Sequence, residues 1–135
     1  MTKKTPRGIR NNNPLNIRIG NSWQGERPNP TDKQFEQFVS MEYGLRAGFI
    51  ILRRYINHYK RNTVQKIISS WAPASENNVN AYVKSVCSRS GISRSRVLTF
   101  SDKPIMVALV EAMCYHENGQ AINIETIMRA YSLVG

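Results

Sequence analysis

The chain has 135 residues, of which 41% are hydrophobic and 9% aromatic, so it is long enough for one folded domain with a buried core. Its 19 Lys and Arg residues against 9 Asp and Glu give a net charge of +10, which favours a polyanionic partner such as nucleic acid, an anionic cell wall or lipid headgroups. No apolar run approaches the roughly 18 residues of a membrane-spanning helix, and no apolar segment follows the charged first residues as in a secretory signal. We therefore expect synthesis in the cytoplasm and, for any action outside the cell, release by other means.

The first quarter of the chain is predicted to be irregular. Residues 1–34 are rich in Asn, Pro, Gly and Arg, which are typical of turns and short extended pieces. Residues 35–39, F-E-Q-F-V, could form a short strand or lead into the first helix.

The rest of the chain carries hydrophobic residues at helical spacing. The expected helices are 41–60 after Ser40, 64–72 after Thr63, one from Ser75 or Asn77 to Gly91, 103–117 after Ser101 or Asp102, and 124–132 after Asn123. The sequence therefore predicts a mainly α fold in one domain over residues 1–135, with a turn-rich segment at 1–34 and a helical part at 40–133.

Cysteine and histidine are too scarce to indicate a metal site. Cys87 and Cys114 both lie in apolar helical contexts, which favours two buried thiols and leaves one disulfide as the alternative. The only histidines are His58 and His116. We expect neither a metal ion nor a cofactor.

A carboxylate stands at the end of the most apolar helix. The helix expected over 103–117 ends in His116-Glu117-Asn118-Gly119. Apolar surroundings raise the pKa of a carboxyl group, which suits a general acid near neutral pH. Enzymes that cleave glycans need such an acid to protonate the leaving glycosidic oxygen. The alternative is a solvent-facing glutamate in the last turn of a core helix.

Several short motifs resemble a known family. Residues 13–18 (N-P-L-N-I-R), 22–25 (S-W-Q-G) and 35–46 resemble, in this order, the N-L-F-x-I-K, W-x-G and F-x-x-Y-x-S motifs of bacterial and phage N-acetylglucosaminidases of the lysozyme-like superfamily. Residues 71–84 are similar to a later family stretch whose tyrosine shapes the cleft. The start R-G-I-R-N-N-N-P also resembles small phage virion proteins. The resemblance implies a lysozyme-like helical domain that binds peptidoglycan glycan strands.

The order of the motifs departs from that family. In the glucosaminidases and lytic transglycosylases the catalytic glutamate lies in a helix before the N-L-F turn, whereas no acidic residue precedes Asn13 here. The helix that ends at Glu117 has the form of the missing one. We therefore hypothesise an arrangement like a circular permutation, in which Glu117 reaches the turn at residues 13–18.

The remaining site residues follow from the same hypothesis. Glu76 is the candidate second carboxylate of a hydrolase, whereas a lytic transglycosylase needs Glu117 alone. The candidate sugar-binding side chains are the aromatic rings of Trp23, Trp71 and Tyr82 and the amides of Asn13, Asn16, Asn77 and Asn118. The alternative is that Trp71 and Tyr82 belong to the core and that the asparagines only form turns.

Three functions are compatible with these observations. The first is cleavage of peptidoglycan at an anionic cell wall, after release or as part of a virion. The second is a virion structural protein that has the fold without the activity and contacts other virion proteins. The third, a basic nucleic-acid-binding protein, is disfavoured because no compact nucleic-acid motif accompanies the charge.

Overall fold

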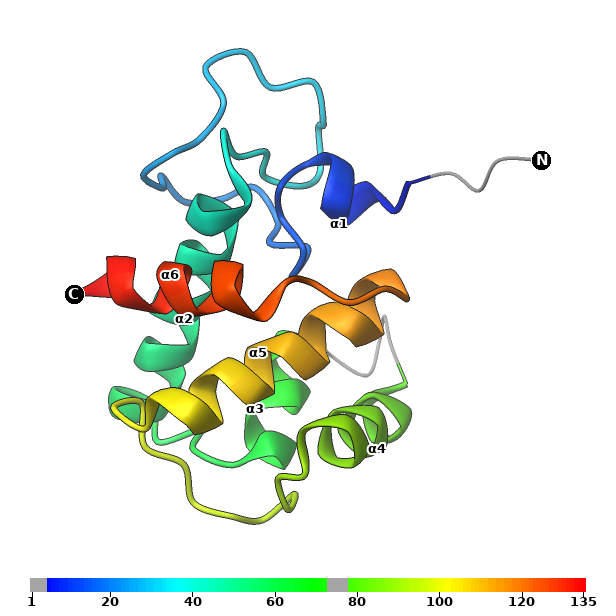
Figure 1. The fold of residues 1–135 in the computed structure, drawn as a ribbon, viewed down its shortest axis with the longest axis vertical. Helices are drawn as coiled ribbons and strands as arrows, with labels where there is room; N and C mark the ends of the chain where they lie inside the picture. The colour runs from blue at the N-terminus through cyan, green and yellow to red at the C-terminus, as the bar shows by residue number, and fades with distance from the viewer. Residues whose placement is uncertain (1–4, 73–77) are drawn as a thin grey trace.

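Helices form the framework of the molecule in the computed structural model, which describes residues 5–72 and 78–135 (Figure 1). The helices in this part of the chain are α1 (Arg7–Arg10), α2 (Met41–Asn57), α3 (Val64–Trp71), α4 (Val79–Ser90), α5 (Lys103–Asn118) and α6 (Ile124–Val134). The predicted mainly α fold is confirmed.

The capping residues explain where most helices begin and end. The side chains of Ser40, Thr63 and Asn123 accept hydrogen bonds from backbone N–H groups in the first turns of α2, α3 and α6, as the sequence predicts. Gly91 and Gly119 adopt left-handed backbone conformations directly after α4 and α5, which only glycine adopts without strain.

Some helix boundaries differ from the prediction. Asn78 caps α4, whereas the predicted caps Ser75 and Asn77 lie outside the described residues. Asp102 precedes α5, but its side chain makes no capping hydrogen bond. Helix α2 ends at Asn57 and not at residue 60, where Lys60 has a positive φ of 55°.

The N-terminal segment contains one short helix that the sequence did not reveal. Helix α1 has only four residues, too few for a hydrophobic period to be visible. Residues 35–39 do not form a strand with a regular ladder. The β pairing in the described residues consists of two isolated bridges, Arg18 with Phe35 and Glu26 with Phe38.

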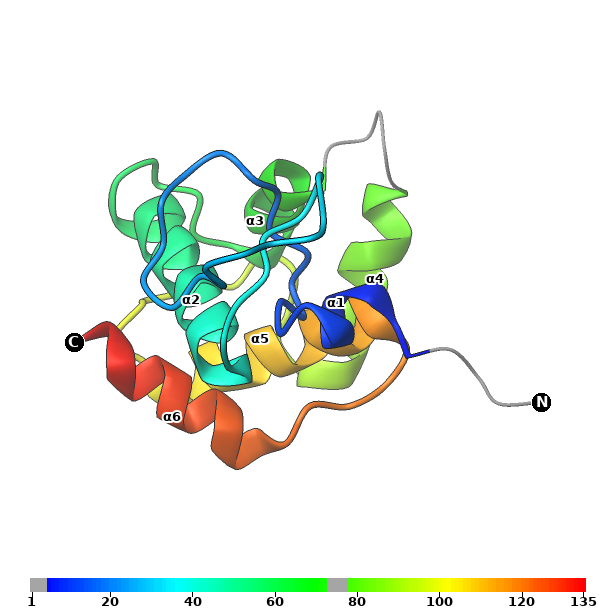
Figure 2. The same ribbon diagram turned by 90° about the horizontal axis from the view of Figure 1, so that it is seen from above.

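The core lies between α2, α5 and the helices packed on them. Helix α6 crosses α2, and α4 runs beside α5, in both views (Figures 1 and 2). The largest fully buried side chains are Tyr82, Phe38, Phe49, Leu15, Leu45, Leu52, Ile67, Ile68, Met106, Leu109, Met113 and Ile127. Because Leu15 and Phe38 are among them, the irregular N-terminal segment is part of this core.

Two glycines let the N-terminal segment approach the helices closely. A Cβ atom on Gly44 of α2 would overlap the backbone carbonyl of Asn12. A Cβ atom on Gly8 of α1 would lie 2.6 Å from Oδ1 of Asn118, at the end of α5. Both views place α1 against this C-terminal end of α5 (Figures 1 and 2). Segments from the two ends of the chain are therefore packed together.

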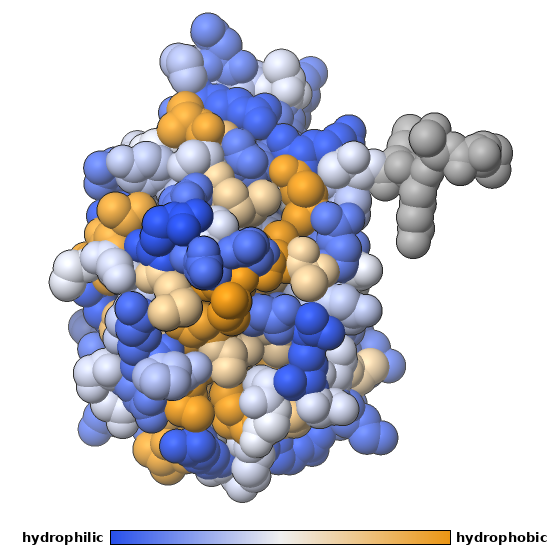
Figure 3. Space-filling model, in the orientation of Figure 1, coloured by the Kyte–Doolittle hydropathy of each residue, from blue (hydrophilic) through white to orange (hydrophobic). Residues whose placement is uncertain are grey.

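The surface is polar with scattered apolar side chains. Figure 3 shows apolar residues on one face, interrupted by hydrophilic ones. Among the described residues, no helix is long and apolar enough to cross a membrane. Cys87 and Cys114 are free thiols, so the alternative of a disulfide between them is wrong. Within the same residues, no three His, Cys, Asp or Glu side chains are grouped in a way that could hold a metal ion.

Candidate active site

Glu117, in the last turn of α5, is bound by side chains from two distant parts of the chain. Its Oε1 accepts a hydrogen bond of 2.8 Å from Nδ2 of Asn16, which lies 101 residues earlier in the sequence. Its Oε2 accepts a hydrogen bond of 2.8 Å from the hydroxyl of Tyr82 on α4. The predicted meeting of Glu117 with the turn at residues 13–18 is therefore confirmed, and both carboxylate oxygens have a fixed direction.

Tyr82 supports Glu117 from inside the protein. The residue is only 1% exposed, and its ring stacks on His116 with 4.0 Å between the ring centroids. Burial, and secondarily the charge of Glu117 and the hydrogen bond to it, raise the pKa of Tyr82 well above its usual value. Tyr82 therefore stays a neutral hydroxyl. The prediction that its ring binds sugar is wrong, because a buried ring presents no face to a ligand.

The turn that carries Asn16 is built by Asn13. The Asn13 side chain is fully buried, donates to the backbone carbonyls of Ile17 and Glu36, and accepts from the N–H of Ile17. Asn16 follows with a positive φ of 53°, a conformation that asparagine tolerates better than most residues. Asn13 therefore has a structural role, and its predicted contact with substrate is wrong because its amide is inaccessible.

Asn118 joins the end of α5 to the same turn. Its Nδ2 donates to the backbone carbonyl of Pro14 at 2.7 Å and to that of Cys114 at 2.8 Å. Its Oδ1 is buried and has no hydrogen-bond partner among the described residues. Both amide atoms of Asn118 are directed into this junction, and its predicted role in substrate binding stays a prediction. The position of Asn118 next to Glu117 fixes the carboxylate relative to the turn.

Glu117 opens into a surface cleft. The lining residues of this Glu117 cleft are Leu15, Asn16, Arg18, Phe35, Trp71, Ala72 and Glu117, around a volume of about 130 Å³. A second cavity, of about 370 Å³, also reaches Asn16, Arg18 and Trp71 and extends to Tyr55. Because the two cavities share these three residues, they are adjacent, and Glu117 lines the smaller one. We refer to them together as the Glu117 groove.

The two tryptophans differ in their relation to the groove. Trp71, at the end of α3, lines both parts of it, lies edge-on to Tyr55 and donates from Nε1 to the carbonyl of Leu15 at 3.4 Å. It is half-buried, so it is at once a packing residue and part of the groove wall. Trp23 packs on the core from the loop and lines neither part of the groove. Of the predicted ring platforms, only Trp71 lines the Glu117 groove.

The second carboxylate of the sequence hypothesis is not placed. Glu76 and Asn77 lie outside the described residues. Among the described residues that line the Glu117 groove, Glu117 is the only acidic one. Glu36 is buried elsewhere in the loop, where burial and the neighbouring Glu26 raise its pKa.

The groove wall also contains residues that were not among the predicted site residues, Arg18 and Phe35 among them. Phe35 and Arg18 belong to the irregular N-terminal segment and form part of the groove wall. The Arg18 guanidinium lies 4.9 Å from the centre of the Phe35 ring. The sequence held a signal for both, because they lie within the two motifs at residues 13–18 and 35–46. What it did not show is the backbone bridge between them, which brings the motifs together.

Comparison with known proteins identifies a phage relative. The chain is 40% identical over 117 residues to a protein named "Protein P5" of Pseudoalteromonas phage PM2. The match covers 84% of this chain and 71% of the relative. The chain belongs to the family of this phage protein. No protein-family model matches the sequence.

Membership in the Protein P5 family supports the predicted link to phages but does not test the predicted lysozyme-like superfamily. The predicted link to phages is confirmed at the level of the family. The name of the relative mentions no reaction, and the predicted membership of the lysozyme-like superfamily stays a prediction. The function must therefore be argued from the groove itself.

Proposed function

We propose that this phage-family protein cleaves the glycan strands of peptidoglycan, with Glu117 as general acid and then general base. The observation that carries the proposal is the oriented Glu117 carboxylate in a surface cleft that lies beside a larger cavity. Asn16 and Tyr82 direct its two oxygens, and Trp71 offers a half-exposed ring beside it. An acid in a fixed position can protonate a leaving glycosidic oxygen, and the neighbouring ring offers a surface on which a pyranose can pack.

A reaction with one carboxylate fits the lining of the groove best. Protonated Glu117 would donate its proton to the glycosidic oxygen as the bond to C1 breaks. The resulting carboxylate would then take the proton of the C6 hydroxyl of the same sugar as that oxygen attacks C1, which closes a 1,6-anhydro ring. The Tyr82 hydroxyl can donate to an oxygen of the carboxylate and equally to the carbonyl oxygen of the carboxylic acid. Tyr82 can therefore stay bound to Glu117 in both states and leave the acidic proton for the glycosidic oxygen.

The first test is digestion of purified peptidoglycan by the wild type and by Glu117→Gln. Glutamine keeps the shape of the side chain, and its oxygen can still accept from Asn16, so we expect a folded variant. Loss of the general acid should lower the rate at least about 100-fold. The control is Glu125→Gln, which removes an exposed carboxylate from the first turn of α6. Equal rates for the wild type and Glu117→Gln would contradict the assignment.

The products define the reaction class. Mass spectrometry of the released fragments should find 1,6-anhydro ends if the sugar hydroxyl is the nucleophile. Reducing ends would indicate hydrolysis by water and would direct attention to Glu76 as the second carboxylate.

A second candidate is a virion component that has no enzymatic activity. The comparison supports it more directly than it supports cleavage, because the relative is a phage protein whose name carries no activity. If the folded wild type releases nothing from several types of peptidoglycan, this candidate replaces the first. Quantitative mass spectrometry of purified virions would then be expected to find the protein in a fixed ratio to the other virion proteins.

A further inference from the structure

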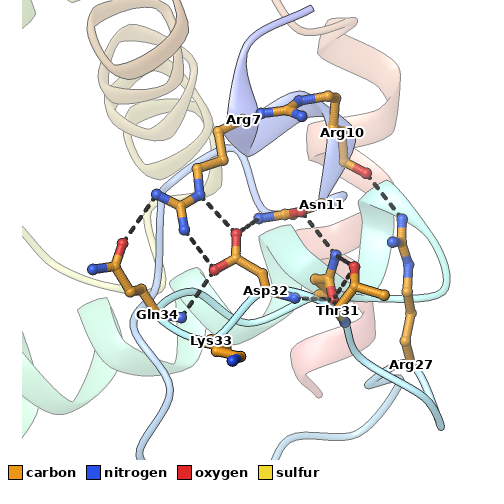
Figure 4. A pocket seen from close by; sticks show the side chains of 9 residues that line it. Arg7, Arg10, Asn11, Arg27, Thr31, Asp32, Lys33 and Gln34 are labelled. Atoms are coloured by element: carbon orange, nitrogen blue, oxygen red, sulfur yellow. Dashed lines mark hydrogen bonds and ion pairs between the residues drawn. The ribbon is translucent and has the colours of Figure 1, made fainter.

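A basic cavity lies next to the Glu117 groove and has no role in the reaction described so far. It has a volume of about 650 Å³, within the size range of small-ligand sites. Its lining residues are Arg7, Arg10, Asn11, Arg27, Thr31, Asp32, Lys33, Gln34 and Gln37 (Figure 4). We call it the basic hollow. It is formed by α1 and by the loop that carries residues 27–37.

The floor of the basic hollow is a rigid hydrogen-bonded network. Asp32 accepts from Nε and Nη2 of Arg7, each at 2.7 Å, and from Nδ2 of Asn11 at 3.0 Å. The backbone N–H groups of Gln34 and Phe35 also donate to it. The Arg7 guanidinium and these donors hold the pKa of Asp32 far below its usual range. The two opposite charges of Arg7 and Asp32 therefore cancel, and the floor is already formed without a ligand.

Three further cations surround this floor without a carboxylate partner. Within residues 5–72 and 78–135, no ion pair is formed by Arg10, Arg27 or Lys33. Arg27 is held in place by the backbone carbonyls of Arg10 and Phe38. The side chains of Arg10 and Lys33 are exposed, on α1 and on the loop respectively (Figure 4). The basic hollow thus has a formal excess of three positive charges, which favours a negatively charged ligand.

The basic hollow and the Glu117 groove share a wall. The guanidinium of Arg7, in the hollow, lies 4.6 Å from the centre of the Phe35 ring, and that of Arg18, in the groove, lies 4.9 Å from it. Phe35 itself lines the groove, and its neighbour Gln34 lines the hollow. The Phe35 ring therefore lies between the two cavities.

We propose that the basic hollow binds the carboxylate groups of the stem peptides that branch from the glycan strand in the Glu117 groove. This inference rests on the proposed function, because it assigns the hollow to a second part of the same substrate. A peptide carries its carboxylates singly, so each can pair with one of the exposed cations Arg10 and Lys33. A nucleic-acid backbone carries a charge on every phosphate, and some of these would face the Asp32 carboxylate.

The test measures the binding of three soluble probes to the Glu117→Gln variant, which lacks the proposed general acid. These are the disaccharide repeat of peptidoglycan with its stem pentapeptide, the same disaccharide without peptide, and the pentapeptide alone. We expect the pentapeptide to tighten binding of the disaccharide about tenfold, the effect of one charge-assisted hydrogen bond. Added Arg10→Gln and Lys33→Gln substitutions should abolish this gain and leave binding of the bare disaccharide unchanged.

The matched control removes two cations elsewhere on the protein. Lys66→Gln with Lys84→Gln lowers the net charge equally at exposed positions of α3 and α4 and should keep the tenfold gain. Loss of the gain in this control as well would mean that net charge alone attracts the peptide, and the proposed site would be wrong.

The three probes separate failure of this inference from failure of the proposed function. If the bare disaccharide binds and the peptide adds nothing, the inference is wrong and the glycan site stands. If the disaccharide does not bind but the pentapeptide binds in a manner that depends on Arg10 and Lys33, the inference stands and the glycan site loses its support. If a DNA duplex binds more tightly than the pentapeptide at equal ionic strength and needs the same two residues, the hollow is a nucleic-acid site and the inference is overturned.

Discussion

At the scale of single residues, the candidate site depends on how the Glu117 carboxylate is held. Asn16 and Tyr82 each direct one oxygen, and each does so from a residue that is itself fixed, by the Asn13 turn and by burial in the core respectively. Glu117 therefore has little freedom to rotate, and its direction in the cleft is set by the protein itself.

Tyr82→Phe tests this positioning role. Phenylalanine keeps the ring that stacks on His116 and fills the same buried volume, but it removes the hydrogen bond to Oε2 of Glu117. Loss of one hydrogen bond to a charged group corresponds to about a tenfold decrease in rate. We expect kcat on peptidoglycan to fall by this amount while KM and the melting temperature change little. An unchanged kcat would show that the Tyr82 hydroxyl is not needed to position Glu117.

Asp32 gives the loop a specific dependence on pH. Its pKa is lowered in the folded protein, so its contribution to stability is complete above the unfolded pKa of about 3.9 and is lost as pH falls below that value. Asp32→Asn should lower the free energy of unfolding at pH 7 by about 1–2 kcal/mol. Chemical denaturation at a series of pH values should show the difference from the wild type shrinking below pH 4. A constant difference down to pH 2 would contradict this account.

At the scale of the elements, the N-terminal segment is held to the helices by close backbone contact. Gly44→Ala places a methyl group against the carbonyl of Asn12, and neither backbone can move without displacing buried neighbours. We expect the variant to lose about 3 kcal/mol or more of stability, or to fail to fold. The control is Gly20→Ala in the loop, where a Cβ meets no atom within 4 Å. Equal melting temperatures for the wild type and Gly44→Ala would refute the proposed close approach.

The helices were predictable to different degrees for identifiable reasons. Ser40, Thr63 and Asn123 are strong capping residues before hydrophobic periods, so the starts of α2, α3 and α6 could be read from the sequence. Helix α1 has no such period. The burial of Asn13 was also not predictable, because its three hydrogen bonds are made with backbone atoms of residues that a turn and a distant loop bring together.

At the scale of the whole molecule, the excess of positive charge predicts how the protein meets its target. A net charge of +10 should attract it to an anionic cell wall. Because the screening length falls from roughly 30 Å at 0.01 M salt to 3 Å at 1 M, adsorption of Glu117→Gln to purified cell walls should weaken strongly over this range. A sedimentation assay measures the bound fraction. Binding that does not depend on salt would show that apolar contacts, and not charge, hold the protein on the wall.

The sequence led to the hypothesis that Glu117 contacts the turn that contains Asn16, but it did not predict the shape of the groove. The departure of the motif order from the resembling family pointed to a contact between the two ends of the chain, and the hydrogen bond between these residues is that contact. The groove depends on Phe35 and Trp71. Both lie in stretches that resemble the family, but the loop bridge and the helix packing that bring them together cannot be read from those stretches.

The hydrogen bond between Asn16 and Glu117 can form only after the ribosome has synthesised both residues. The ribosome makes the Asn16 turn early, but its partner follows 101 residues later, which at translation rates of about 5–20 residues per second is roughly 5–20 s. During that interval the nascent chain has no assembled Glu117 groove. A chain interrupted before Glu117 therefore lacks the hydrogen bond that joins the Asn16 turn to the end of α5.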